Sequence, residues 1–200
     1  MPAALRRCCA LLLVLAACDE APAPEPMSPP EVADLAACAP AATWPEEWSA
    51  AERAVLAEIN ALRAEGGACG TLQFAPAPPL RMHPTLRCAA RLHTADMIAR
   101  QFVSAIDPDG VGTGARLAAL GYAAATFGEV VNAITETVAD PADDARDAVI
   151  AWRDNPASCW QLRARELTDV GIGGNLGMFT PKDQEPTPAA YWTLTVAAPP

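Results

Sequence analysis

The sequence predicts a single α+β domain in which helices pack against a small antiparallel sheet. The segment 86–101 has helical periodicity with an unusually wide apolar band, so we expect it at the centre of the domain. Residues 170–176 and 191–197 are apolar segments with strand character, and a polar hairpin loop at 180–188 separates them. The chain therefore places helices first and strands later, with one more helix among the strands.

The first helix is expected from Ser49 to about Glu65. Ser49 and Glu52 have the spacing of a capping box, in which each side chain satisfies a free backbone N–H of the helix start. Gly66 and Gly67 end the helix. Its core face is formed by Val55, Ile59 and Leu62.

The central helix follows Pro84, because proline is favoured in a first helical turn. Its inner face carries Leu86, Ala90, His93 and Met97, at positions that share one side of a helix. His93 is the unusual member, because the chain contains only two histidines.

The remaining elements follow from local signals. Asp107–Gly110 is a turn, and it lacks the further acids of a calcium loop, so we expect a structural role. A short helix should span about 114–120, and an extended segment residues 128–134. Asp140 and Pro141 start the next helix, as N-cap and first helical residue, and Asn155-Pro156 ends it.

Residues 1–17 have the features of a cleaved export signal. Arg6 and Arg7 precede the apolar run 10–15, and Leu15-Ala16-Ala17-Cys18 follows in the place of a lipobox. The segment resembles bacterial lipoprotein signals, which implies lipidation of Cys18 and a membrane-anchored position in the cell envelope, facing the periplasm or the exterior. The alternative is an ordinary secretory signal cut near Ala17.

Residues 18–42 are rich in proline and alanine and are expected to form an extended tether after Cys18. The globular domain is expected over residues 43–198. The chain has a net charge of −10, and loss of the two signal arginines makes it more negative. This charge argues against nucleic acid or anionic lipid headgroups as partners.

Four cysteines remain after the signal and Cys18 are set aside: Cys38, Cys69, Cys88 and Cys159. An even number in an exported chain predicts two disulfides, with three possible pairings. Their spacing does not match a zinc motif, so a metal site built from these thiols is not expected.

The order of these landmarks resembles the CAP superfamily (cysteine-rich secretory proteins, antigen 5 and pathogenesis-related proteins), in its bacterial SCP-like branch. The matching stretches run over most of residues 43–198. They are Ile59–Ala64, Pro79-Leu80, Pro84–Leu86, His93–Met97, Asp107–Gly110, Arg116, Gly121-Tyr122, Gly128-Glu129, Trp152–Pro156, Thr168–Gly173 and Tyr191–Thr193. The resemblance implies an α-β-α sandwich of CAP type with a surface cleft.

The resemblance also implies a cleft in which two histidines and acidic residues hold a divalent metal. In this chain Ala105 and Ser158 stand at the two histidine positions, while the acid Glu129 is retained. Alanine offers no donor atom and serine is a poor zinc ligand. We therefore expect a degenerate cleft without metal or cofactor.

Two alternatives stay open for each retained cleft candidate. His93 is either a cleft residue or a core histidine that ties helix to loop. Glu129 either lines the cleft or pairs with Arg116 or another base to neutralise a buried charge. A catalytic triad of Ser158, His93 and Glu129 is a weak further hypothesis, because no local motif marks a nucleophile. The resemblance implies a Cys69–Cys159 disulfide, which leaves Cys38 for Cys88.

These observations favour a lipid-anchored envelope protein that binds a small ligand or an envelope protein and is not an enzyme. A metal-dependent hydrolase is the alternative, and it requires a metal that these residues are poorly suited to hold. A purely structural spacer is the third possibility.

Overall fold

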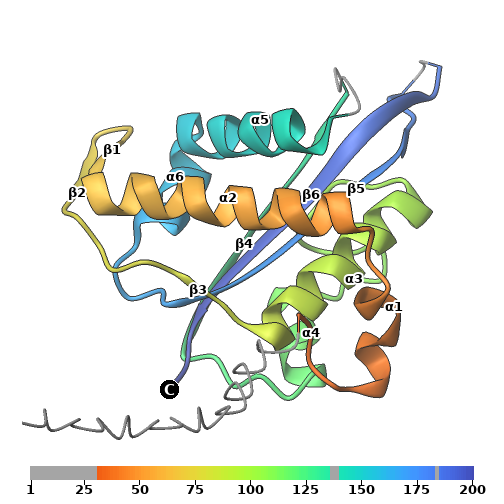
Figure 1. Ribbon diagram of the computed structural model, residues 1–200, viewed down its shortest axis with the longest axis horizontal. Coiled ribbons are helices and arrows are strands. Elements are labelled where there is room, and N and C mark those ends of the chain that lie inside the picture. Colours follow the sequence, from red (N-terminus) through yellow and green to blue (C-terminus); the bar gives the residue numbers. More distant parts are fainter. Residues whose placement is uncertain (1–30, 136–139, 183–184) are drawn as a thin grey trace, which may run out of the picture.

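The structure is a computed structural model that describes residues 31–135, 140–182 and 185–200. Figure 1 shows the arrangement of its elements. In chain order they are η1 (Ala36–Cys38), α1 (Ala39–Ala42), α2 (Glu46–Glu65), β1 (Gly67–Cys69), β2 (Leu72–Phe74), β3 (Arg81–Met82), α3 (Pro84–Arg100), α4 (Thr113–Ala119), β4 (Thr126–Ile134), α5 (Pro141–Asp154), α6 (Pro156–Arg163), β5 (Asp169–Phe179) and β6 (Thr187–Ala198).

The main sheet has four strands in the order β3-β5-β6-β4. The three long strands are antiparallel, and β3 adds a two-residue parallel pairing to the start of β5. β1 and β2 form a separate small hairpin. This is the predicted α+β class with an antiparallel sheet.

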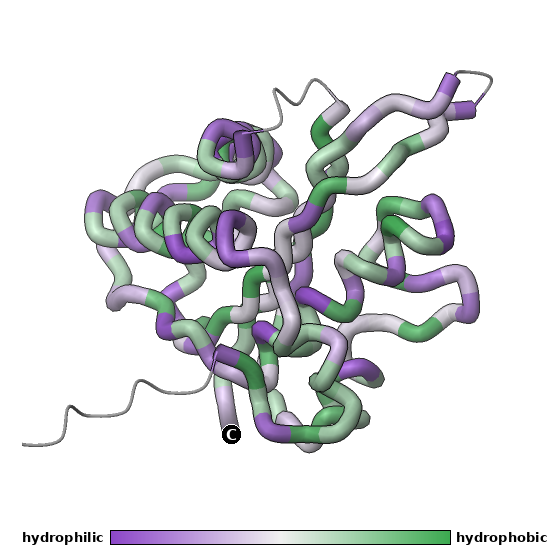
Figure 2. Tube along the Cα trace, turned by 45° about the vertical axis from the view of Figure 1, so that its right-hand side comes forward, coloured by the Kyte–Doolittle hydropathy of each residue, from purple (hydrophilic) through white to green (hydrophobic). Residues whose placement is uncertain are grey.

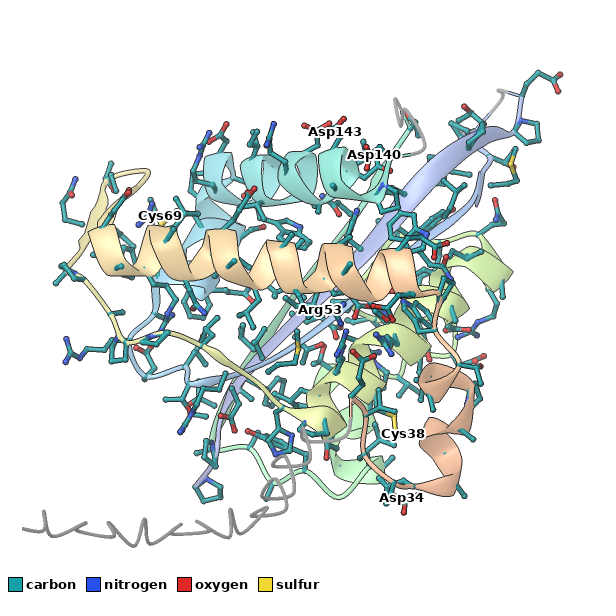
Figure 3. All side chains as sticks on the ribbon, viewed as in Figure 1. Asp34, Cys38, Arg53, Cys69, Asp140 and Asp143 are labelled. Atoms are coloured by element: carbon teal, nitrogen blue, oxygen red, sulfur yellow. A yellow bond between two sulfur atoms is a disulfide. The ribbon has the colours of Figure 1, made fainter. Side chains whose placement is uncertain are left out.

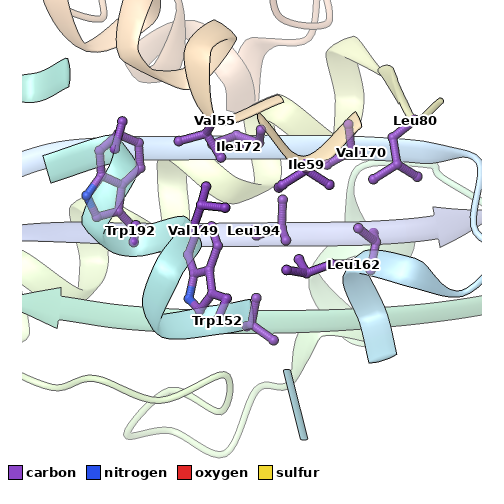
Figure 4. Close-up of a cluster of buried hydrophobic side chains, with 14 of the residues drawn as sticks. Val55, Ile59, Leu80, Val149, Trp152, Leu162, Val170, Ile172, Trp192 and Leu194 are labelled. Carbon is purple, nitrogen blue, oxygen red and sulfur yellow. The ribbon is translucent and has the colours of Figure 1, made fainter. Parts of the chain in front are cut away.

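The sheet lies between two helical layers, as Figure 1 shows. Because side chains alternate along a strand, Trp192 and Leu194 of β6 face α2 and α5, while Tyr191 and Thr193 face α3. Figure 4 shows the core between the sheet and the layer formed by α2, α5 and α6. Figure 2 shows hydrophilic and hydrophobic residues alternating along the helices, as expected for elements covered on one face. The chain therefore forms the α-β-α sandwich that the resemblance implied.

Two glycines of β5 allow α3 to lie directly on the sheet. A Cβ atom on Gly171 would come within 2.0 Å of the Leu86 backbone, and one on Gly173 within 2.6 Å of the Arg91 nitrogen. These contacts are too short for any side chain. The glycines thus fix the position of α3, and with it the position of His93.

The predicted capping box at Ser49 is wrong. α2 begins at Glu46, directly after Pro45, so Ser49 and Glu52 lie inside the helix and are buried. Glu52 does not reach back to its own helix start. It accepts hydrogen bonds from Arg87 and Arg91 on α3 instead.

The boundary between tether and domain also differs from the prediction. Val32, Cys38 and Ala41 are buried, and the Ala33 amide donates a hydrogen bond to the Pro84 carbonyl. Residues 31–42 therefore pack on α3 as part of the domain, although their proline and alanine content suggested an extended segment. Residues 1–17, predicted to be a signal segment, as well as Cys18 and residues 19–30, lie outside the described residues.

Pro156 begins a helix that the sequence analysis missed. Asn155 ends α5 as expected, but its side chain also accepts a hydrogen bond from the Ala157 amide and caps α6. The same residue pair that stops one helix therefore starts the next. Within the described residues, no helix is both long and apolar enough to cross a membrane.

The two disulfides have the pairing that the resemblance implied. Cys38 is bonded to Cys88 and Cys69 to Cys159, with Cα atoms 5.6 Å apart in both cases. Figure 3 labels Cys38 and Cys69, which lie at different ends of the domain. They join residues 50 and 90 positions apart, and the chain-entropy model gives each link about 4 kcal/mol of stabilisation.

Candidate functional site

Three elements bring two of the predicted cleft residues, Glu129 and His93, together with Thr113 and Arg116 on the α3 side of the sheet. β4 carries Glu129, α3 carries His93, and α4 carries Thr113 and Arg116. On β4 the neighbouring Val130 faces the α2 and α5 layer, so alternation directs Glu129 to the opposite layer. The position of Glu129 in this site therefore depends on the register of β4.

Glu129 is fully engaged inside the protein. Its side chain is 1% exposed and pairs with the Arg116 guanidinium. Its two oxygens also accept hydrogen bonds from Thr113 Oγ1, at 2.8 Å, and Thr195 Oγ1, at 2.7 Å. A buried carboxylate requires such partners. Of the two alternatives for Glu129, the structure shows the pairing with Arg116.

His93 is buried beside this pair and tied to a loop. Its Nε2 lies 2.8 Å from the Ser104 carbonyl and 3.9 Å from Glu129 Oε2. A carbonyl only accepts, so Nε2 carries the proton, and the buried Nδ1 has no partner among the described residues. Burial lowers the pKa of His93 below its ordinary value, although the nearby Glu129 acts in the opposite direction. The neutral ring links α3 to the loop, as the core alternative predicted.

The two positions at which the resemblance implied metal-binding histidines, Ala105 and Ser158, have different surroundings. Ala105 lies beside the cluster, because its carbonyl accepts a hydrogen bond of 2.9 Å from Arg116 Nη2. Ser158 lies on α6, which packs on the other face of the sheet through Leu162. No hydrogen bond among the described residues joins Ser158 to His93 or Glu129. The structure therefore does not assemble the hypothetical triad.

A sequence comparison identifies the family. A model of the cysteine-rich secretory protein family, CAP, matches residues 56–176, which is more than half of the chain. The chain belongs to the CAP family. No curated protein matches it significantly.

Two solved structures share the CAP fold with this chain. One is an extracellular protein containing an SCP domain from Bacillus anthracis, with 17% identity and a TM-score of 0.56, covering 75% of this chain and 41% of that protein. The other is an outer surface protein from Borrelia burgdorferi, with 14% identity and a TM-score of 0.55, covering 76% of this chain and 94% of that protein. The chain thus spans less than half of the Bacillus protein, and these likenesses show the fold alone.

The residues of this CAP domain do not fit a divalent metal at Glu129. Zinc sites in proteins use three or four nitrogen, sulfur or oxygen ligands from the protein. Here Glu129 is already neutralised by a guanidinium, and the ring nitrogen of His93 that faces it carries a proton. Among the described residues, no group of three or more His, Cys, Asp or Glu side chains is arranged to hold a metal ion.

A second buried charged cluster was missed by the sequence analysis. Glu52, Arg87 and Arg91 are almost fully buried where α2 crosses α3. Arg91 donates to Glu52 and Ser49 and stacks its guanidinium 5.3 Å from the Trp44 ring. Glu31 covers the cluster from the N-terminal segment and pairs with both arginines. The spacing of Arg87 and Arg91 on one helical face was the available signal.

Proposed function

We propose that this CAP domain is a non-catalytic binding module of the cell envelope, held at a membrane by lipid on Cys18. The observation that best supports a non-catalytic role is that the Glu129 carboxylate is already occupied by hydrogen bonds inside the protein. A general base or metal ligand needs a free lone pair directed at substrate or metal. The Glu129 carboxylate instead accepts from Arg116, Thr113 and Thr195 in the protein interior.

The anchor rests on the sequence and on the disulfides of the domain. The lipobox ends at Cys18, and the described part of the domain begins at Glu31, so only a short stretch of sequence separates the two. Two disulfides are typical of proteins that fold outside the cytoplasm. An anchored, cross-linked domain is suited to hold a partner near the membrane surface.

Native mass spectrometry of the protein purified from its own envelope without chelator tests this proposal. We expect a chain that carries lipid on Cys18 and has no bound zinc. One zinc per chain in the parent, lost in a Glu129→Gln variant, would instead support a metal-dependent hydrolase. A chain that begins after Ala17 without lipid would contradict the anchor.

A further inference from the structure

We propose that the outer edge of β4 accepts an extended peptide strand from a partner protein. This inference deepens the proposed function and rests on it for the existence of a partner. β4 is the last strand on its side of the sheet, and Figure 4 shows it beside β6 at the sheet's border. A border strand presents its unused backbone groups to any strand that can pair with it.

The hydrogen bonds of β6 show which groups of β4 are unused. The Ala197 carbonyl accepts from Thr168 on the β5 side, whereas the Ala198 carbonyl accepts from Ala125 on the β4 side. Odd-numbered residues of β6 therefore bond toward β5 and even-numbered ones toward β4. In the β4–β6 register Glu129 is opposite Thr195 and Val131 is opposite Thr193, so odd-numbered β4 residues point their backbone groups outward.

The outward row consists of the N–H and C=O groups of Phe127, Glu129, Val131 and Ala133. None of these backbone groups has a hydrogen-bond partner among the described residues. Glu129 keeps intermediate exposure although its side chain is 1% exposed, so its exposed area belongs to its backbone. The row is therefore accessible at its centre.

The opposite border of the sheet is closed by the protein itself. The Gly174 carbonyl accepts from Trp44 Nε1, and its amide donates to Glu52. Gln101 donates to the Met178 carbonyl farther along β5, and β3 pairs with the start of that strand. β4 has no comparable cover among the described residues. It also lacks the lysine and proline that commonly protect free strand edges.

The surroundings of the edge favour a single strand over a second globular copy. The segment 103–106 lies near Glu129, because the Ala105 carbonyl and Glu129 share the Arg116 guanidinium. Val103 and Ile106 on this segment are exposed, as is Phe127 at the start of β4. On the other side Gln161 of α6 lies against Gly128. These flanking segments favour a single strand over a bulky partner, and the exposed apolar side chains suit apolar residues of that strand. A net charge of −10 favours a basic one.

Backbone amide exchange followed by NMR tests the proposal on the full mature protein. In the free protein we expect fast exchange at Phe127, Glu129, Val131 and Ala133, and slow exchange at the alternate residues bonded to β6. Addition of the synthetic peptide Thr-Val-Lys-Val-Thr-Val-Lys-Val-Thr at millimolar concentration should slow the four fast amides about tenfold or more. A copy with N-methylated backbone amides should have no effect.

A Val131→Pro variant removes one outward N–H and no bond to β6, so it should keep its fold and bind the peptide about three- to tenfold more weakly. Val131→Thr keeps the N–H and should bind like the parent. If the proline variant does not fold, the exchange pattern of the parent decides. Slow exchange at the four amides of the free monomer, or no slowing by the peptide, overturns the proposal.

If the four amides exchange slowly and sedimentation shows a dimer, the β4 edge pairs with a second copy of the chain. That result also overturns the proposal of a peptide partner. None of these results depends on metal content or lipidation. Failure of the strand-binding proposal can therefore be distinguished from failure of the proposed function.

Discussion

Glu129 is a carboxylate inside the protein, and Arg116 supplies the opposite charge that makes its burial possible. Removing one partner of such a pair leaves an uncompensated charge, which costs far more than a surface ion pair. We therefore expect Arg116→Met to lower the free energy of unfolding by about 3–5 kcal/mol. Urea denaturation measures this change.

The matched control is Arg153→Met, because Arg153 pairs with Asp154 on the surface. Because solvent screens this exposed pair, the control should leave the free energy of unfolding nearly unchanged. Equal effects of the two variants would show that Glu129 does not need its guanidinium.

His93 should make stability depend on pH. Burial holds its pKa below the unfolded value of about 6.5. As the pH falls below that value, the unfolded chain binds a proton that the folded chain refuses, so folding becomes less favourable. Unfolding free energies measured from pH 7.5 to 5.5 should therefore fall more steeply in the parent than in His93→Gln. Parallel curves would mean that the ring titrates normally in the folded protein.

At the level of elements, the contact between α3 and β5 requires a very close approach of two backbones. Gly171 faces the Leu86 backbone with no room for a methyl group. Gly171→Ala should separate helix from strand and destabilise the domain by about 3 kcal/mol. Gly112→Ala is the control, because the nearest atom to its Cβ would be 4.0 Å away, and it should cost about 1 kcal/mol at most. Thermal melts of both variants compare them, and similar melting temperatures would refute the close packing.

Sequence patterns located elements well where the determinants were local. Asp140 caps α5 as expected, and Asp107 closes its turn with bonds to the Asp109 and Val111 amides. The capping box at Ser49 failed because a glutamate three residues after a serine has the same pattern whether it bonds locally or across helices. Only tertiary packing brought Arg87 and Arg91 to Glu52.

The candidate site could be predicted only in outline. Glu129 and Arg116 were recognised as possible partners, but Thr113 and Thr195 were not, because no motif links them to Glu129. Their contribution depends on strand register and on the position of α4.

The packed segment 31–42 shows the same limit. Its composition predicted a tether, whereas the disulfide at Cys38 and the pairing of Glu31 with the buried arginines hold it on the domain.

For the whole molecule, the proposed lipid on Cys18 decides where the protein resides. Cys18→Ser removes the thiol that we propose is acylated, and it should release the protein from membranes into the soluble fraction. Cys9→Ser is the control, because Cys9 lies within the proposed signal segment, so its loss should not change membrane association. Membrane fractionation followed by immunoblotting compares the three proteins. Retention of the Cys18→Ser variant in membranes would rule out the lipid anchor.

The central claim is that Glu129, which the resemblance placed in a metal-binding cleft, instead forms an internal ion pair with Arg116 in this CAP domain. Zinc titration by calorimetry into the mature protein, after removal of bound metal, tests it most directly. We predict no saturable zinc binding, and the same flat titration for Glu129→Gln. Stoichiometric binding by the parent that disappears in Glu129→Gln would contradict the claim, because it would require Glu129 to leave Arg116 and act as a ligand.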